Sequence, residues 1–394
     1  MSLPAALHDL SYVWMAKSLM LLLALVALSA PAAADDTRVC GAPVALNDGW
    51  SLAQQTEVGL DPARLCELDA FIAQWPEANI HAVVVVRNGK LAMERYFSGA
   101  DERWGSSLGT VQYAADVKHD LRSISKSVTS LLVGIARGEG RFPALESSAI
   151  DFFPRYASLK TADNARITFA DFLTMSSGLA WDESLPYSNP ANSERRLIDA
   201  ADPLKYVFEQ RLVARPGETY NYNGGGTTVL AAALAKATGQ RLDDYARDKL
   251  FSPLDITDFE WVKLPFAADS PPAAASGLRL RARDTAKLGR ILLSDGAWKE
   301  KQVLPKGWAA DSIKPRLNGD GLYFYGYQWW LGRSFRNGAE LTWAAGVGYG
   351  GQRLYVVPAL DLVVMVNAGH YGGPLQGVIP LGIFTRVVLP AVKD

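Results

Sequence analysis

The chain has 394 residues, of which 49% are hydrophobic and 21% are charged. These fractions are typical of a globular protein and exclude a disordered, collagen-like or coiled-coil chain. Lys and Arg total 40 against 41 for Asp and Glu, so the net charge is −1, and no basic run is long enough to follow a phosphate backbone. We therefore expect no nucleic-acid partner. A chain of this length predicts one large two-part domain or two domains.

The N-terminus has the pattern of a secretory signal peptide. A lysine precedes an apolar run over 19–28, and a run of small residues ends at Ala34 before two aspartates. The apolar run is too short to span a bilayer, for which roughly 20 residues are needed. We predict a signal peptide over 1–34, a periplasmic or secreted protein, and no membrane span in the mature chain. Translation starts at either Met1 or Met15.

Cysteines and histidines are few. Cys40 and Cys66 form an even pair in a chain predicted to be exported, which favours a disulfide. Two thiols without a nearby histidine cannot complete a tetrahedral metal shell. The histidines of the mature chain, His81, His119 and His370, are far apart and lack the spacing of a zinc motif. We predict no metal and no cofactor.

The expected elements run in the order strands, helices, strands. They are a helix over 61–76, a hairpin over 82–97, helices over 125–136, 169–175, 203–212, 227–237 and 242–250, strands over 327–331, 354–357 and 362–366, and a helix over 381–392. Because the flanking strands must share a sheet, we predict an α+β fold in which an antiparallel sheet flanked by helices carries an inserted all-helical subdomain.

The same pattern gives the expected domain boundaries. They are an N-terminal extension over 35–79 and one domain over 80–390, with sheet parts at about 80–119 and 276–394 and the helical insertion at about 120–275. The Pro- and Ala-rich stretch 271–275 is expected to link the insertion back to the sheet.

Two short motifs are rejected on their context. The stretch 105–109 fits the G-x-S-x-G of a nucleophile elbow, but charged residues rather than a buried strand precede it, so we predict a surface loop. The stretch 346–351 fits G-x-G-x-x-G, yet a strand rather than a helix follows. It therefore has no helix N-terminus that would bind a pyrophosphate.

Ser123 and Lys126 form an S-x-x-K motif that leads directly into an apolar helix. Residues three apart share a helix face, so the hydroxyl and the amine can meet. Apolar neighbours would bury the lysine, lower its pKa and supply the neutral amine that takes the serine proton. The motif alone is equally consistent with a serine that caps the helix and a lysine that extends into solvent.

Two loops add candidate residues. Tyr220 and Tyr222 lie in a Gly- and Asn-rich loop between helices, where a phenol can relay a proton. The glycine-rich stretch 348–351 opens a strand, where a backbone N–H can face an oxyanion.

With these elements in order, the chain resembles the serine β-lactamase and penicillin-binding-protein superfamily. The resemblance is greatest to its β-lactamase-related branch of esterases and 6-aminohexanoate-dimer-hydrolase-like amidases. It covers about residues 80–390 and rests on the stretches 83–97, 123–126, 173–179, 220–224, 276–278, 284–289, 327–330 and 348–358.

The resemblance implies that Ser123 is the acylated nucleophile, Lys126 its base, and Tyr222 the proton relay that begins the family's Tyr-x-Asn element. Tyr220 is the competitor for that register. The further implied positions are an oxyanion site at the backbone amides of Ser123 and Tyr349, and substrate contacts at Gly224, Gly346 and Gly350.

Two departures from the family pattern concern the substrate. Gly224 replaces the Asn of Tyr-x-Asn, and the usual Lys-Thr-Gly or His-x-Gly is replaced by 344–346, Ala-Ala-Gly, which has no cation. β-Lactams and peptidoglycan stems carry a carboxylate that this cation helps bind. We therefore expect hydrolysis of a less acidic small-molecule ester or amide through an acyl-enzyme. The alternatives are a β-lactamase or D,D-peptidase, and a non-catalytic binding protein on the same scaffold; the oligomeric state is left open.

Overall fold

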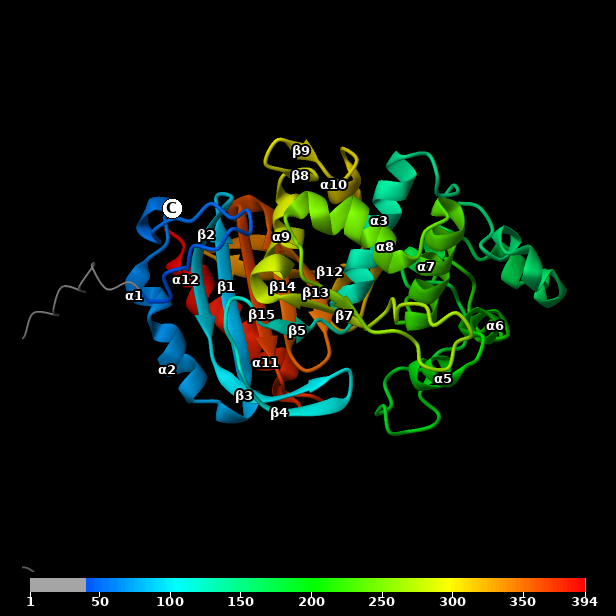
Figure 1. Cartoon of the computed structure of the whole chain (residues 1–394), viewed down its shortest axis with the longest axis horizontal. Coiled ribbons are helices and arrows are strands. Elements are labelled where there is room, and N and C mark those ends of the chain that lie inside the picture. Colours follow the sequence, from blue (N-terminus) through cyan, green and yellow to red (C-terminus); the bar gives the residue numbers. More distant parts are fainter. Residues whose placement is uncertain (1–39, 394) are drawn as a thin grey trace, which may run out of the picture. The chain divides into compact units, whose positions relative to one another are not determined.

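The computed structural model describes residues 40–393, so the predicted signal peptide lies outside the described residues. In residues 40–393 an eight-stranded antiparallel sheet has the order β10-β11-β12-β13-β14-β15-β1-β2 (Figure 1). Its strands are β1 (Ile80–Arg87), β2 (Lys90–Tyr96), β10 (Leu317–Asn318), β11 (Phe324–Tyr325), β12 (Trp330–Arg336), β13 (Ala339–Gly348), β14 (Gln352–Val357) and β15 (Leu362–Ala368). Strands from the two ends of the chain meet at β15 and β1, where Val84 lies opposite Met365. The predicted α+β class is confirmed.

Helices cover both faces of this sheet. One face carries α1 (Pro62–Leu65), α2 (Glu67–Ala73), α11 (Leu375–Gly382), a π-helical turn (Ile383–Val388) and α12 (Leu389–Ala391), and the other carries α3 (Ile124–Gly138) and α9 (Ala282–Leu293). Successive valines of β1 point to opposite faces of the sheet. Val83 belongs to the same hydrophobic core as Ile383 of the π-helical turn, and Val84 to the same core as Ile291 of α9. Burial on both sides explains the unbroken valine run of this strand.

A helical subdomain follows α3 in sequence. Its helices are α4 (Phe169–Leu173), α5 (Ser193–Asp199), α6 (Pro203–Phe208), α7 (Gly224–Thr238) and α8 (Leu242–Ala246). The central helix α7 packs against α3, α4 and α6. In Figure 1 the green helices α5, α6 and α7 gather on the side opposite α1 and α2. The predicted helix over 203–212 is too long, because it ends at Phe208.

Smaller β elements complete the fold. They are the hairpin β3 (Ser98–Arg103) and β4 (Ser106–Gln112), the three strands β5 (Lys118–Asp120), β7 (Leu278–Arg281) and β6 (Glu260–Trp261), and the pair β8 (Ala297–Trp298) and β9 (Lys301–Gln302), while α10 (Trp308–Ser312) is a short helix. The stretch 105–109 is exposed as expected, but the prediction of a loop is wrong because most of it pairs with β3 as a strand. Pairing with β3 gives the backbone N–H and C=O groups of this stretch hydrogen-bond partners although the stretch is not buried.

Two differences affect the strands near the site. The predicted strand over 327–331 begins only at Trp330, because Gln328 has a left-handed φ of 64° that turns the chain. The ten-residue strand β13 was not among the expected strands. Its Ala- and Gly-rich second half has low strand propensity, and neighbours on both sides hold it in the sheet.

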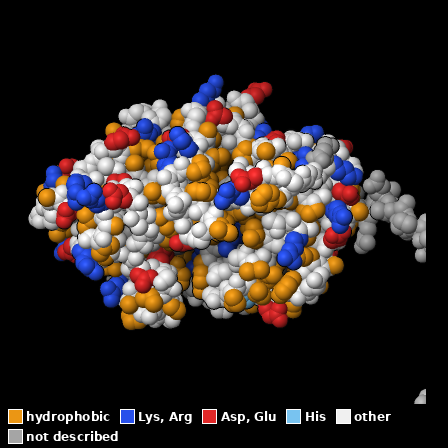
Figure 2. Space-filling model, turned by 180° about the vertical axis from the view of Figure 1, so that it is seen from behind, with side chains coloured by type: hydrophobic (Ala, Val, Ile, Leu, Met, Phe, Trp, Pro, Cys, Tyr) orange, Lys and Arg blue, Asp and Glu red, His pale blue; other side chains and the backbone are white. Residues whose placement is uncertain are grey.

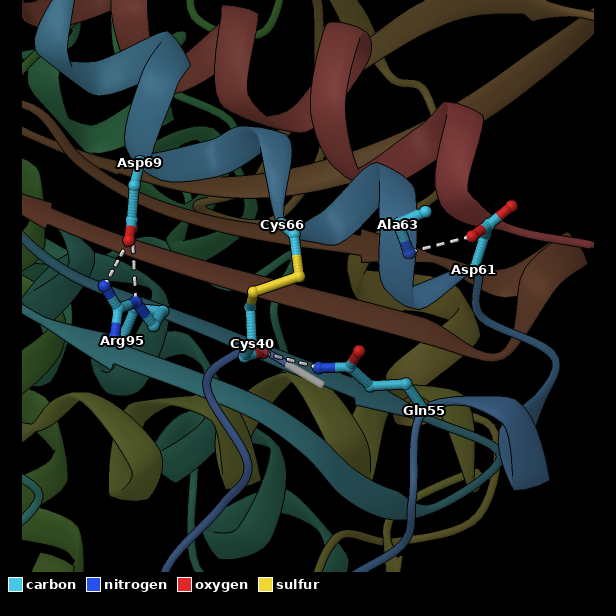
Figure 3. Close-up of a disulfide and its surroundings, with 7 residues drawn as sticks. All are labelled: Cys40, Gln55, Asp61, Ala63, Cys66, Asp69 and Arg95. Carbon is cyan, nitrogen blue, oxygen red and sulfur yellow. Dashed lines mark hydrogen bonds and ion pairs between the residues drawn. A yellow bond between two sulfur atoms is a disulfide. The ribbon is translucent and has the colours of Figure 1, made fainter. Parts of the chain in front are cut away.

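The N-terminal segment 40–79 is attached to the sheet. A disulfide joins Cys40 to Cys66 with a Cα–Cα distance of 5.2 Å, and Gln55 donates a hydrogen bond of 2.7 Å to the Cys40 carbonyl (Figure 3). In the same view, Arg95 of β2 pairs with Asp69 of α2. This segment therefore packs as part of the sheet's covering layer.

Positive and negative side chains are interspersed on the face seen in Figure 2. Within residues 40–393, no helix combines the length and apolar character needed to cross a bilayer.

Candidate active site

Ser123 lies immediately before α3, at the edge of a cavity. The preceding segment is held by β5, and the Leu121 amide donates a hydrogen bond of 2.9 Å to the Leu278 carbonyl. Arg122 then takes a left-handed φ of 49°, and its guanidinium lies 3.1 Å from the Asp120 carboxylate. The Ser123 side chain makes no capping hydrogen bond to the helix. Its hydroxyl is instead available to the lysine one turn later.

Lys126 is 1% exposed and points inward. Its Nζ donates hydrogen bonds to Ser123 Oγ at 3.0 Å and to the Ala275 carbonyl at 3.1 Å. The stretch 271–275, expected only as a link, therefore supplies an acceptor that positions the lysine. Of the two arrangements open to the S-x-x-K motif, this geometry is the paired one and not the solvent-facing one.

Tyr222 is the tyrosine that contacts this pair. Its ring centroid lies 4.7 Å from Lys126 Nζ, its phenol interacts electrostatically with Lys126, and it lines the same cavity as Ser123. Tyr220 packs against Tyr325 instead, with ring centroids 5.1 Å apart, and its buried hydroxyl has no partner among the described residues. The structure therefore places Tyr222, and not Tyr220, beside Ser123.

Two glutamates that the sequence analysis did not identify lie beside Gly224. Glu183 accepts hydrogen bonds from the Gly224 amide and, at 2.6 Å, from Trp181 Nε1. Glu194 is 1% exposed and accepts a hydrogen bond of 2.8 Å from Tyr187. A Cβ at Gly224 would lie 2.9 Å from Glu183 Oε1. Gly224, at the third position of the Tyr-x-Asn element, thus leaves room for the carboxylates of both glutamates. No sequence motif includes either glutamate, so the sequence analysis could not identify them.

These carboxylates change the electrostatics expected for Lys126. Burial by itself lowers the pKa of Lys126, but Tyr222, Glu194 and Glu183 together outweigh burial and raise that pKa above its ordinary value. The predicted lowering is therefore wrong. Burial also raises the pKa of Tyr222, with Lys126 opposing it. Burial and the charge of Glu194 raise the pKa of Glu183 to about 7.

The cavity in front of Ser123 has a volume of about 700 Å³. Three acids, Asp182, Glu183 and Asp320, line it, and among its described lining residues Arg353 is the one with a cationic side chain. Arg353 lies on β14 opposite Val347 of β13, and its Nη1 donates to the carbonyls of Gly348 at 2.9 Å and Gln352 at 2.8 Å. A neighbouring strand therefore supplies a cation that 344–346 lacks.

The remaining predicted positions divide into two groups. Tyr349 lines the same cavity as Ser123. Gly346 packs against α3, where a Cβ would lie 3.2 Å from Ile124, and Gly350 packs against Tyr371, where a Cβ would lie 2.4 Å from the ring. Gly224, Gly346 and Gly350 are all absent from the described cavity lining. Each of these glycines makes room for a protein side chain, and the substrate contacts expected at these positions stay a prediction.

The sequence model of the Beta-lactamase family matches residues 68–374. The chain belongs to the β-lactamase family. Its S-x-x-K serine, lysine and Tyr222 all fall within the matched region of this family member.

Similarity to individual proteins is lower. The family member is 25% identical to a 6-aminohexanoate-dimer hydrolase of Paenarthrobacter ureafaciens over 81% of this chain and 84% of the relative. A solved Bacillus anthracis protein, provisionally designated a 6-aminohexanoate-dimer hydrolase, has a TM-score of 0.64 at 21% identity, covering 89% of this chain and 87% of its own. EstCE1, a hydrolase with promiscuous acyltransferase activity, has a TM-score of 0.63 at 17% identity, covering 82% and 98%. These structures share the fold, and the family is one of hydrolases.

Proposed function

We propose that this β-lactamase-fold hydrolase cleaves esters or amides through an acyl-enzyme on Ser123. The observation that carries the proposal is the 3.0 Å contact between Lys126 Nζ and Ser123 Oγ, with the Tyr222 ring centroid 4.7 Å from the same amine, at a cavity of about 700 Å³. A nucleophile, a proton-accepting pair and room for a substrate are the requirements of nucleophilic acyl transfer.

The proposed reaction has two halves. The Ser123 hydroxyl gives its proton to the Lys126–Tyr222 pair as its oxygen attacks the carbonyl carbon, and the pair returns the proton to the leaving group. The backbone amides of Ser123 and Tyr349 stabilise the oxyanion. Water then hydrolyses the acyl-serine with the same pair as base. Because lysine and tyrosine share protons, the ionisation that governs the rate belongs to the pair.

Ser123→Ala is the direct test. We expect kcat/KM for a neutral p-nitrophenyl ester to fall by roughly 10³-fold or more, since members of one catalytic unit fail together, while the circular dichroism spectrum is retained. A fluorophosphonate probe should label the wild type and not the variant. The matched control is Ser107→Ala, which alters the central serine of the rejected G-x-S-x-G motif on the exposed strand β4. Full activity and labelling of Ser123→Ala would refute the proposal.

The substrate is best sought with a panel of uncharged p-nitrophenyl esters and short linear amides. The linear 6-aminohexanoate dimer belongs in the amide arm because a relative is named for its hydrolysis. Nitrocefin turnover would identify β-lactamase activity instead, and binding without turnover of any member would identify a binding protein.

Export to the periplasm or the medium is also part of the proposal. It is supported by the leader sequence over 1–34 and by a cysteine pair suited to an oxidising compartment. Mass spectrometry of the secreted protein should give an N-terminus at Asp35.

A further inference from the structure

Three side chains far apart in sequence meet outside the cavity in front of Ser123. His81 of β1, Asp101 of β3 and His119 of β5 are respectively 0%, 5% and 1% exposed. One ligand atom from each lies within 4.8 Å of the other two. The sequence analysis judged these histidines only by their spacing along the chain, which does not detect ligands supplied by three different strands.

The hydrogen bonds around this His81–Asp101–His119 cluster determine where the imidazole protons lie. His119 Nδ1 is 2.9 Å from the Asp120 carbonyl, which only accepts, so Nδ1 carries a proton. His81 Nε2 is 3.1 Å from Asn79 Oδ1. The Asn79 amide is oriented by its own donation of 2.7 Å to the Ala100 carbonyl, so Oδ1 accepts and His81 Nε2 carries a proton.

When both imidazoles are neutral and protonated in this way, His81 Nδ1 and His119 Nε2 each carry a lone pair and no proton. These two nitrogens face each other at 2.9 Å. An oxygen of the Asp101 carboxylate lies 3.6 Å from His119 Nε2. Three electron-pair donors thus converge in a buried space, an arrangement that is unfavourable without a cation between them.

A single shared proton accounts for only part of this geometry. It would bridge the two nitrogens, but 3.6 Å is too long for a hydrogen bond from His119 to the carboxylate. A zinc-sized ion about 2.0–2.1 Å from each ligand holds tetrahedral ligand atoms roughly 3.3 Å apart. The observed separations of 2.9 and 3.6 Å lie on either side of that value.

The surrounding groups match the outer shell of a metal site. Metal-bound histidines usually donate their other N–H to a carbonyl or carboxylate oxygen, and ligating carboxylates are themselves hydrogen-bonded. Here the two outer N–H groups face oxygens of Asp120 and Asn79, and the phenols of Tyr113 and Tyr371 both donate to Asp101.

We propose that His81 Nδ1, His119 Nε2 and a carboxylate oxygen of Asp101 bind one divalent transition-metal ion of the zinc class. The ion joins β1, the β3–β4 hairpin and β5. Tyr371 bonds Asp101 at 2.7 Å and stacks under the Arg122 guanidinium at 5.0 Å, next to Ser123. The ion therefore has a structural role, holding the segment that leads to the candidate nucleophile.

The test uses the full chain purified without a polyhistidine tag, stripped with a chelator and titrated with zinc or cobalt. We expect elemental analysis to find one ion per chain, a rise in Tm on adding zinc back, and visible cobalt bands of a low-symmetry site. Asp101→Asn and His119→Gln should weaken zinc binding at least about 100-fold. The control His370→Ala changes a histidine outside the cluster and should leave affinity unchanged.

Wild-type protein that takes up neither ion and gains no thermal stability would overturn the proposal, and this measurement does not depend on whether the variants fold. Equal zinc affinity in wild type and Asp101→Asn, or an equal loss in His370→Ala, would also overturn it. None of these results bears on Ser123, so the metal site and the proposed hydrolase activity are tested separately.

Discussion

Lys126 combines burial with contacts to three neighbours. It bonds Ser123 Oγ and the Ala275 carbonyl, and its Nζ lies 4.7 Å from the centroid of the Tyr222 ring. A guanidinium at this position would keep the positive charge but could not exchange a proton in the accessible pH range. We expect Lys126→Arg to be as inactive toward a neutral ester as Lys126→Ala, each measured as kcat/KM. Substantial activity in the Arg variant would instead make Tyr222 the base and Lys126 an electrostatic support.

Glu183 provides a pH test of the same pair. Its carboxylate, ionised above about pH 7, raises the pKa of both Lys126 and Tyr222. Since the reactive state has lost a proton from the pair, kcat/KM should rise with pH. Glu183→Gln removes the negative charge, lowers both pKa values, and should move this rising limb to lower pH by about one pH unit.

The measured quantity is the pH at which kcat/KM rises, not the plateau value of kcat/KM, because a change in substrate binding alters the plateau value alone. Glu218→Gln is the control, since Glu218 is exposed and absent from the described cavity lining. An unshifted limb in Glu183→Gln would show that Glu183 does not influence the pair.

At the scale of elements, the disulfide attaches the start of the described chain to the helices over the sheet. It closes a loop with a sequence separation of 26 between Cys40 and Cys66. Replacing both cysteines with serine should lower the free energy of unfolding by about 2–4 kcal/mol in the chain-entropy model, measured by urea denaturation. Activity should persist under native conditions because neither cysteine lines the cavity. Two free thiols in exported wild-type protein would contradict the pairing.

The α3 helix and the stretch 271–275 show how separate elements build one site. Helix geometry puts Ser123 and Lys126 on one face, but the acceptor that orients the ammonium is the Ala275 carbonyl, more than a hundred residues later. The Thr129 hydroxyl also reaches the Ala274 carbonyl at 3.4 Å. This stretch, which looked like a linker, is therefore part of the wall that holds the lysine.

At the scale of the whole molecule, charges from several elements set the character of the cavity. Its three acids face a single described cation, Arg353, whose Nη1 is already bonded to two carbonyls. Opposed like charges cost several kcal/mol, so neutral esters should exceed matched carboxylate esters in kcat/KM by roughly 10²–10³-fold. The ratio should shrink at high ionic strength.

Asp320→Asn should lower the ratio of kcat/KM for neutral esters to kcat/KM for carboxylate esters, because it removes one exposed acid from the cavity lining. Arg353→Gln should raise the same ratio, because it removes the cation. Rapid turnover of penicillins by the wild type would mean that Arg353 holds the carboxylate despite the acids around it.

The sequence by itself determined those features of the fold and of the site that depend on residues close together in the chain. The valine run and the Asn-Gly turn specify the β1–β2 hairpin, and spacing of three on a helix brings Ser123 and Lys126 together. The cysteine pair and the order of strands and helices were likewise readable, because short-range backbone preferences and periodic burial act within a few residues. The resemblance then supplied Tyr222 as the third member.

Only the tertiary structure decided what depends on distant residues. The raised pKa of Lys126 comes from Tyr222, Glu194 and Glu183, and the cation that lines the cavity is Arg353. His81, Asp101 and His119 meet from three different strands. Gly346 and Gly350 pack against side chains because of neighbours that no local pattern reveals. Electrostatic interactions and ligand geometry act through space, so residues that carry no motif can set the charge of a site and assemble a second one.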